Sequence, residues 1–225
     1  MRIWLTRKKQ NTTPSTGEPD VTEGWLHPES AQTLLAETTR QQLIQFIRQS
    51  TALPASLFER FWLIPIHRFA ELAQLFPASE NHHHSHAGGL LDHSLEAACY
   101  AARLRQSYLF PPDAAPEDQA AQSERWTTVI IYAALLHDLG KLITDIEVEN
   151  FSGKRWFPWH GPLTQPYRFR YLPQRDYLRH PAAAVLLLTQ LIPPEKPRLA
   201  RRRHRCIIHP TPLPERTVSV CRAGG

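Results

Sequence analysis

The feature that most limits how this chain can fold is an apolar stretch from Trp126 to Leu139. A helix that is apolar almost all round is typical of the middle of a bundle, where neighbours cover every face. Gly140 follows, and glycine often supplies the residue that ends a helix. The stretch therefore predicts a buried central helix that ends at Gly140.

The other patterns also favour helices, with one short β excursion. Pro28-Glu29-Ser30 indicates a helix start, and apolar positions continue this helix to Pro54. Residues 144–159 alternate apolar and acidic side chains around Ser152-Gly153, which predicts a β-hairpin. Further helices are expected over 56–76 (interrupted at Pro65), 90–106 and 182–192, with a linker over 111–124. The predicted fold is mostly α, a helical bundle with a short β-hairpin insertion and disordered termini.

Charge divides the chain into a body and two basic ends. The net charge is +5, but residues 1–10 carry four basic groups and no acid, and residues 196–222 carry a net +7. The remainder has a net charge of −6, which argues against a uniformly basic nucleic-acid binder. The expected parts are a disordered leader (1–24), a folded domain (25–192) and a basic, Pro-rich tail (193–225). For the tail, native disorder and a frame-shifted or truncated sequence are both open hypotheses.

The number of cysteines and the lengths of the apolar segments predict where in the cell the protein is located. Cys99, Cys206 and Cys221 form no Cys-x-x-Cys pair and are odd in number, so no disulfide framework is predicted. The first residues turn polar too quickly for a secretory signal. No run approaches the roughly 18 apolar residues of a membrane span. We therefore expect a cytoplasmic protein with no membrane span.

The end of the apolar stretch carries residues that could bind a metal. At a helix end, the adjacent His137 and Asp138 can converge on one ion. His137 shares a stripe with Ile130 and Ala133, so we expect it to point into the core, where an unpaired polar group is costly. His93 lies on the preceding helix, and bundle metal sites are built from facing helices. Each histidine alone could be an ordinary core histidine, but the combination favours a divalent-metal site.

These residues resemble the HD superfamily of metal-dependent phosphohydrolases. Gly88-Gly-Leu-Leu-Asp-His-Ser-Leu-Glu is followed, 44 residues after His93, by Leu-Leu-His-Asp-Leu-Gly-Lys. The resemblance implies an HD-domain helical bundle in which His93, His137 and Asp138 bind a divalent metal. The family closes its ligand set with a late Asp, whereas this sequence has no Asp after Asp176. Either another residue completes the set or the chain is a truncated relative.

A narrower resemblance covers residues 25–192. His82, His83 and His84 precede Ala87-Gly-Gly, and Trp156-Phe-Pro-Trp-His-Gly-Pro and His180 follow the His-Asp pair. This order is similar to the N-terminal domain of MobH-class, TraI-related conjugative relaxases of integrating conjugative elements, which are sometimes labelled putative helicases. The resemblance implies nicking or processing of DNA at a transfer origin, as single strand or supercoiled duplex, with the conjugation machinery as a further partner.

The same resemblance extends the candidate ligands. It implies that His82, His83 and His84 bind metal or the scissile phosphate, and that His160 and His180 bind a second metal. The alternatives are a solvated loop for the histidine run, a hairpin cap beside Trp159 for His160, and a plain helix start for His180.

Mixed imidazole and carboxylate ligation favours Mn, Fe, Co, Ni or Zn over Ca. Such a metal would serve phosphodiester hydrolysis by acidifying water and neutralising phosphate oxygens. Asp138 is then expected to orient the water or bridge two metals. Lys141 is expected to touch a phosphate oxygen, unless it is only a cation at a helix C-terminus.

DNA contact is predicted for basic side chains that interleave with aromatic ones. Arginines can hold phosphates while aromatic rings stack unpaired bases. The alternative is an ordinary charged surface loop, and no tyrosine is assigned as a nucleophile. The arginines are Arg168, Arg170, Arg175 and Arg179, and the aromatic residues are Tyr167, Phe169, Tyr171 and Tyr177.

Three functions follow from these patterns. The first is a metal-dependent, relaxase-like DNA-processing domain, active or a truncated remnant. The second is a general HD-type nucleotide phosphohydrolase or nuclease. The third is a non-catalytic DNA-binding fragment, favoured by the missing late Asp. The sequence has no Gly-x4-Gly-Lys-Ser/Thr motif, so nothing in it supports helicase activity.

Overall fold

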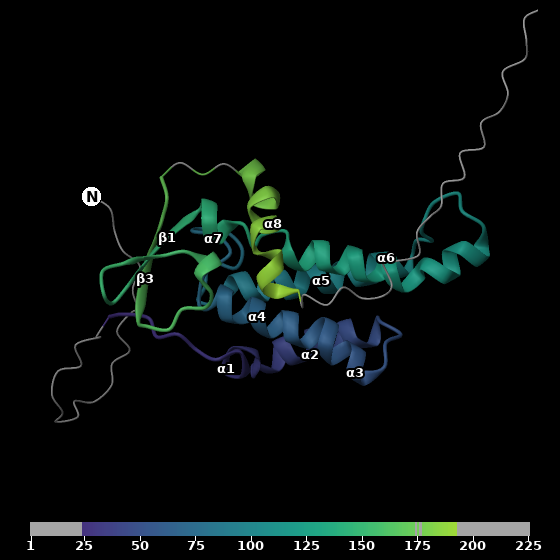
Figure 1. The fold of residues 1–225 in the computed structure, drawn as a ribbon, viewed down its shortest axis with the longest axis horizontal. Helices are drawn as coiled ribbons and strands as arrows, with labels where there is room; N and C mark the ends of the chain where they lie inside the picture. Colours follow the sequence, from purple (N-terminus) through teal and green to yellow (C-terminus); the bar gives the residue numbers. More distant parts are fainter. Residues whose placement is uncertain (1–23, 174, 176, 193–225) are drawn as a thin grey trace, which may run out of the picture. The chain divides into compact units, whose positions relative to one another are not determined.

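The computed structural model describes residues 24–173, 175 and 177–192. Helices dominate them, so the predicted mostly α fold is confirmed (Figure 1). The leader (1–24, apart from Gly24) and the tail (193–225) lie outside the described residues. The α-helices are α1 (Ala31–Leu35), α2 (Thr38–Gln49), α3 (Ala55–Phe58), α4 (Ile64–Ala73), α5 (Gly89–Gln106), α6 (Pro116–Leu136), α7 (Lys141–Thr144) and α8 (His180–Leu191). Short turns are π-helical over Glu59–Leu63 and 3-10 over Pro158–His160 and Tyr177–Arg179.

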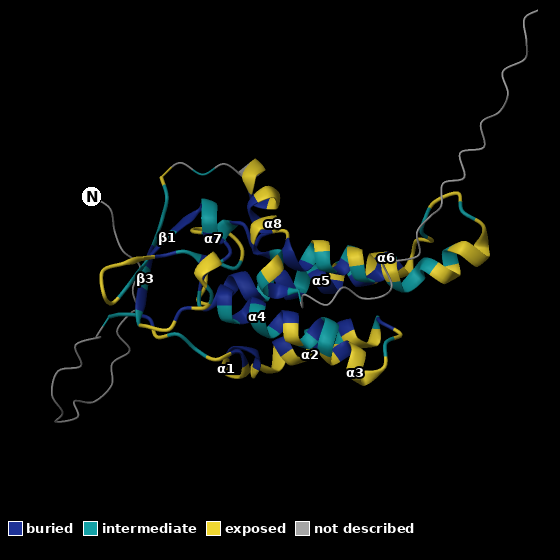
Figure 2. Cartoon of the chain, viewed as in Figure 1, coloured by how far each residue is buried: buried dark blue, intermediate teal, exposed yellow. Residues whose placement is uncertain are grey.

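The centre of the bundle is formed by α4 and α5. Helices α1 and α2 pack on one side of this pair, α6 packs along α5, and α8 packs on α4 (Figure 1). Burial follows this arrangement, with the buried residues concentrated on α4 and α5 (Figure 2). Phe69 of α4 and Leu91 and Leu95 of α5 are fully buried. The central pair therefore carries the core, and its ends position the histidines described below.

The helix predicted from Ser30 to Pro54 is two helices, α1 and α2. The Ser30 hydroxyl accepts a hydrogen bond from the Thr33 amide at 3.2 Å, which caps α1 as expected. The chain then turns at Glu37, whose backbone is extended. Side chains satisfy the carbonyls left free at the break, because Arg40 donates to the Leu34 oxygen at 2.5 Å.

Pro65 lies in the first turn of α4, directly after the π-helical turn, so the predicted interruption is a change of helix type and not a break in the helical stretch. The chain passes from α3 through a π-helical turn into α4 without a gap. Pro65 has no amide hydrogen to donate to the carbonyl of Phe61, four residues earlier. The Tyr132 hydroxyl of α6 donates to that carbonyl instead. A long-range hydrogen bond thus replaces the one that proline removes.

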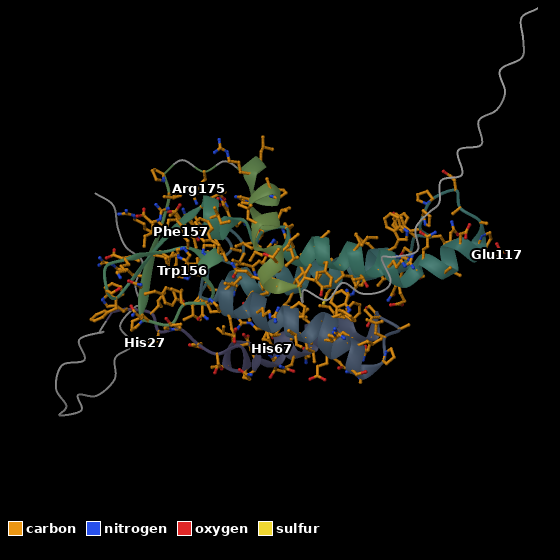
Figure 3. All side chains as sticks on the ribbon, viewed as in Figure 1. His27, His67, Glu117, Trp156, Phe157 and Arg175 are labelled. Atoms are coloured by element: carbon orange, nitrogen blue, oxygen red, sulfur yellow. The ribbon has the colours of Figure 1, made fainter. Side chains whose placement is uncertain are left out.

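Helix α6 differs from the prediction at both ends and in its burial. It begins at Pro116, so residues 116–124 are helical and not part of a linker. Proline at the helix start and two acids in the first turn, Glu117 (labelled in Figure 3) and Asp118, are favourable N-terminal residues. Only one face is buried, with Val129 59% exposed and Ile131 fully buried.

The same helix is the one described segment, extended to Pro116–Thr144, that is long and apolar enough for a membrane span by length and composition. Its window is 44% buried inside the structure. Ile131 and Leu135 face the core, and α6 packs along α5. This packing accounts for the apolar residues on the buried face of α6.

Gly140 does not cap α6 in a left-handed conformation, because its φ is −62°. Helix α6 ends at Leu136, and a tight turn through His137 and Asp138 leads into α7. A Cβ atom on Gly140 would lie 2.1 Å from the carbonyl oxygen of His180. Glycine is required here for the close approach of α8.

The predicted hairpin is present but belongs to a three-stranded antiparallel sheet. β1 (Ile146–Asn150) lies between β2 (Arg155–Trp156) and β3 (Tyr167–Tyr171). The third strand was not predicted. Tyr167 and Phe169 pack against Phe76, with ring centroids 5.5 and 5.2 Å apart. The sheet is thereby attached to the end of α4, next to the histidine-rich loop.

Candidate metal centre

His93, His137 and Asp138 converge as the sequence predicted. One donor atom from each lies within 4.8 Å of the other two. The two Nε2 atoms are 3.3 Å apart. The Asp138 Oδ2 atom lies 3.3 Å from His93 Nε2 and 3.4 Å from His137 Nε2. Donors that face one point at such distances form a set that could hold a cation.

The ending of α6 explains how successive residues reach one point. His137 is the C-cap, and the chain leaves helical geometry after it. The His137 Nδ1 atom lies 2.7 Å from the carbonyl oxygen of Ala134. A carbonyl can only accept, so Nδ1 carries the hydrogen and Nε2 keeps a lone pair for a metal.

His137 does not point into the core, contrary to the prediction. Its side chain is 42% exposed. The buried stripe of α6 passes through Ile131 and Leu135, whereas Ala133 is exposed. His137 continues the exposed stripe, so it lies at the rim of the site.

The Asp138 carboxylate is buried and is stabilised in its charged form by neighbouring side chains. Burial by itself would raise the pKa of Asp138, but hydrogen bonds from His93 and Lys141 outweigh it and lower this pKa well below its usual range. Lys141 Nζ donates to Asp138 Oδ2 at 2.6 Å and to the carbonyl of Ala78 at 2.9 Å. Asp138 is therefore ionised at neutral pH.

His180 enters the same site from α8. It is buried, its Nδ1 lies 3.8 Å from Asp138 Oδ1, and its Nε2 lies 2.8 Å from Asp145 Oδ1. His180 was predicted from the sequence, whereas Asp145 was not. The only signal for Asp145 was a carboxylate seven residues after Asp138, beyond the short helix α7.

The histidine run reaches the site through His84. Its ring centroid is 5.3 Å from that of His93, and its Nε2 lies 3.2 Å from Glu96 Oε2. His82 and His83 are exposed and do not belong to the three-donor cluster. Sequence reasoning missed Glu96, although it stands one helical turn after His93 on α5.

His160 is not part of the three-donor cluster either. It ends the 3-10 turn and is exposed, with its ring edge-on to Phe157 and Trp159 (centroids 5.9 and 6.0 Å apart). The structure thus brings His84 and His180 towards His93, His137 and Asp138, and leaves His160 apart from that cluster.

A buried ion pair supports the start of α5. Arg40, from α2, donates to both carboxylate oxygens of Asp92 at 2.6 and 3.1 Å. Burial would raise the pKa of Asp92, but the hydrogen bonds from Arg40 and His86 outweigh it, so that pKa is lowered. Asp92 directly precedes His93, so this pair holds the helix turn that carries the first ligand candidate.

The arginines predicted to contact DNA lie around the sheet. Arg168 pairs with Glu149 at 3.1 Å and Arg170 with Glu147 at 2.8 Å, both across β1 and β3. Arg175 pairs with Glu80 at 2.6 Å, and Arg179 ends the last 3-10 turn.

Two of the aromatic residues of β3, Tyr167 and Phe169, do not have the predicted position. Tyr167 and Phe169 are buried against Phe76 because strand residues alternate between faces, so neither ring can stack a DNA base. The side chain of Tyr177 lies outside the described part.

The chain was compared with known protein families. The family model TraI_2, described as "Putative helicase", matches residues 24–200, which is more than half of the chain. No curated protein matches. The matched span contains His93, His137, Asp138, His84 and His180.

Proposed function

This chain belongs to the TraI_2 family, described as putative helicases, and from that premise we propose that it processes DNA in conjugative transfer. The finer proposal is a metal-dependent phosphodiesterase of the HD type, acting as in MobH-class relaxases. Its substrate is transfer-origin DNA, and the conjugation machinery is its partner. The sequence contains no Gly-x4-Gly-Lys-Ser/Thr motif that would support ATP-driven unwinding, and the proposal is therefore one of phosphodiester chemistry.

The observation that carries the proposal is the convergence of His93, His137 and Asp138 within 4.8 Å. Two imidazoles and one carboxylate are a donor set that suits Mn, Fe, Co, Ni or Zn. Three protein ligands leave positions for water and substrate, as catalytic sites require. When bound, such a metal supplies an acidified water and neutralises charge on phosphate oxygens.

Neighbouring residues orient the His137 ring and keep the Asp138 carboxylate charged, as metal binding requires. The hydrogen on His137 Nδ1 is held by the Ala134 carbonyl, which directs Nε2 towards the cluster. Lys141 keeps Asp138 ionised through a 2.6 Å contact. We therefore propose that the main role of Lys141 is to position Asp138. A contact of Lys141 with a phosphate oxygen, as predicted from the sequence, would be a second role.

His180 is proposed to take the place of the missing late Asp. It comes from the last described helix, where the HD pattern puts its closing ligand. Asp145 holds its Nε2 at 2.8 Å, so the other ring nitrogen, Nδ1, faces Asp138 at 3.8 Å. His180 would then be a further ligand on the Oδ1 side of Asp138, whereas His93 and His137 face Oδ2.

Metal content tests this proposal directly. The full chain is purified, reconstituted with Mn, Fe or Zn, and analysed by elemental mass spectrometry beside a His137→Ala, Asp138→Ala variant. His67→Ala, on α4 (labelled in Figure 3), is the matched control. We expect near-stoichiometric metal in the native chain and in the control, and its loss from the double variant.

Activity is then measured as conversion of supercoiled transfer-origin plasmid to open circles. Nicking that requires both the metal and His137 supports the relaxase-like function. Hydrolysis of free nucleotides without nicking would instead favour the general HD phosphohydrolase. A native chain that binds no metal after reconstitution contradicts the enzymatic proposal altogether.

A further inference from the structure

A cavity of about 280 Å³ adjoins the candidate metal centre. Its lining includes Lys141, Asp145, Tyr171 at the end of β3, and Arg175, which is labelled in Figure 3. Lys141 is also bonded to Asp138, and Asp145 is also bonded to His180. Two residues of the lining thus make direct contacts with Asp138 and His180 of the candidate metal centre.

The charges that line this cavity are already paired. Lys141 contacts Asp138 and Arg175 contacts Glu80, both at 2.6 Å, while Asp145 contacts His180 at 2.8 Å. The carboxylates of Glu80 and Asp145 would repel a bare phosphate. A neutral ligand with both donors and acceptors fits this lining better than an anion does.

Tyr171 contributes a buried polar atom to the part of the chain around this cavity. The Tyr171 hydroxyl is buried and makes no hydrogen bond to any residue that the structure describes. Burial, with a contribution from Glu80, raises the pKa of Tyr171 above its usual value, so this hydroxyl keeps its proton and remains a donor. The Arg175 guanidinium lies 5.0 Å from the centre of the tyrosine ring.

We propose that this cavity binds one unpaired nucleobase of the strand whose phosphate is processed at the metal centre. A nucleobase is planar and uncharged and carries both donors and acceptors on its edge. Tyrosine rings and arginine planes are the usual partners of splayed-out bases. The cavity is close to the lower end of the roughly 300–1,000 Å³ found for small-molecule sites. The proposal rests on the proposed function, because the strand in question is the one that is processed at that site.

The test compares Tyr171→Phe with the native full chain in binding to single-stranded DNA. The probes are fluorescein-labelled ten-nucleotide strands of dA, dC or dT and a fully abasic strand of equal length, followed by fluorescence anisotropy in EDTA. We expect at least one base-bearing strand to bind roughly fivefold more weakly, as the loss of one hydrogen bond predicts. The abasic strand should bind equally well. Tyr100→Phe, an exposed tyrosine of α5, is the matched control and should change nothing.

A second measurement tests the premise about the hydroxyl. The melting temperature of Tyr171→Phe should be equal to or above that of the native chain, because a buried donor without a partner is removed. A second variant, Asn81→Trp, places a large ring at an exposed lining position and should also weaken only the base-bearing strands. Equal weakening of the abasic strand, no change in any strand, or a lower melting temperature for Tyr171→Phe would each overturn the proposal.

Because these assays need neither metal nor cleavage, their outcome is separate from that of the proposed function. A chain that binds metal and nicks DNA but shows no dependence on Tyr171 refutes only the base cavity. A chain with the base dependence but no metal refutes only the phosphodiesterase.

Discussion

Replacing Lys141 by methionine tests the electrostatic account of Asp138. Lys141 and Asp138 are 19% and 10% exposed, so their 2.6 Å contact is largely removed from solvent. Removing one partner of a buried ion pair typically costs about 3–5 kcal/mol. Asp138 keeps its contact with His93, so we expect Lys141→Met to lower the free energy of unfolding by about 2–3 kcal/mol at pH 7 in EDTA.

The pH dependence gives a sharper criterion. An aspartate with a lowered folded-state pKa stabilises the protein above its ordinary pKa of about 4, and this contribution is lost as the pH falls through the folded pKa. Without Lys141 the folded pKa of Asp138 rises towards the ordinary value. The variant should therefore lose less stability than the native chain between about pH 5 and pH 2.

Urea denaturation followed by circular dichroism at several pH values measures both effects. Lys154→Met is the control, because Lys154 is exposed and its replacement should change stability by less than about 0.5 kcal/mol. The reasoning is refuted if Lys141→Met behaves like this control, or if its deficit is the same at pH 2 as at pH 7.

Three further predictions concern the packing that positions the site. Tyr132→Phe should destabilise the chain by about 1–2 kcal/mol in urea denaturation, because the Phe61 carbonyl loses its donor while the ring stays packed. Gly140→Ala should cost more than about 2 kcal/mol and should weaken metal binding in titration calorimetry, since the new Cβ would lie 2.1 Å from a carbonyl oxygen of α8. Ile131→Ala should cost about 2–5 kcal/mol, whereas Val129→Ala on the exposed face of α6 should cost less than about 0.5 kcal/mol; equal losses would contradict the burial assigned to that helix.

Periodic apolar residues were enough to predict most helices, and the errors have identifiable physical causes. Residues 116–124 were assigned to a linker because proline and acids are common in loops. The same residues are favourable in a first helical turn, where Pro116 needs no donor and Glu117 meets the positive end of the helix dipole. Local composition cannot separate these two cases, because the choice depends on whether α5 is available for packing.

The burial of α6 shows a second limit. An apolar side chain indicates that burial is favourable, but not that a neighbour exists to cover it. Val129 and Ala133 face away from α5, so they remain exposed despite their composition. His137 follows this exposed stripe, and the argument that placed it in the core was wrong for the same reason. Its convergence with Asp138 was predicted correctly because it depends only on the local end of the helix.

The supporting residues were beyond sequence reasoning, since they act through long-range contacts. Arg40 meets Asp92 across 52 positions in the chain, and Lys141 reaches the Ala78 carbonyl across 63. Neither pair has a sequence signature. Tyr132 similarly donates to the Phe61 carbonyl across the bundle, so the helical stretch continues past Pro65 with a change of helix type.

Asp138 is the residue at which the elements of this site meet, and this determines how the site would fail. His93 comes from α5, Lys141 from α7 and His180 from α8, so the geometry around one carboxylate depends on three separate packings. Helix α8 packs mainly on α4 and α7, and its approach requires Gly140. A change that weakens the packing of α8 would therefore move His180 away from Asp138. The contact of α5 with α6, which places His93 next to His137, would remain. Metal affinity should then fall before the bundle unfolds, which makes affinity the more sensitive measure of how α8 is docked.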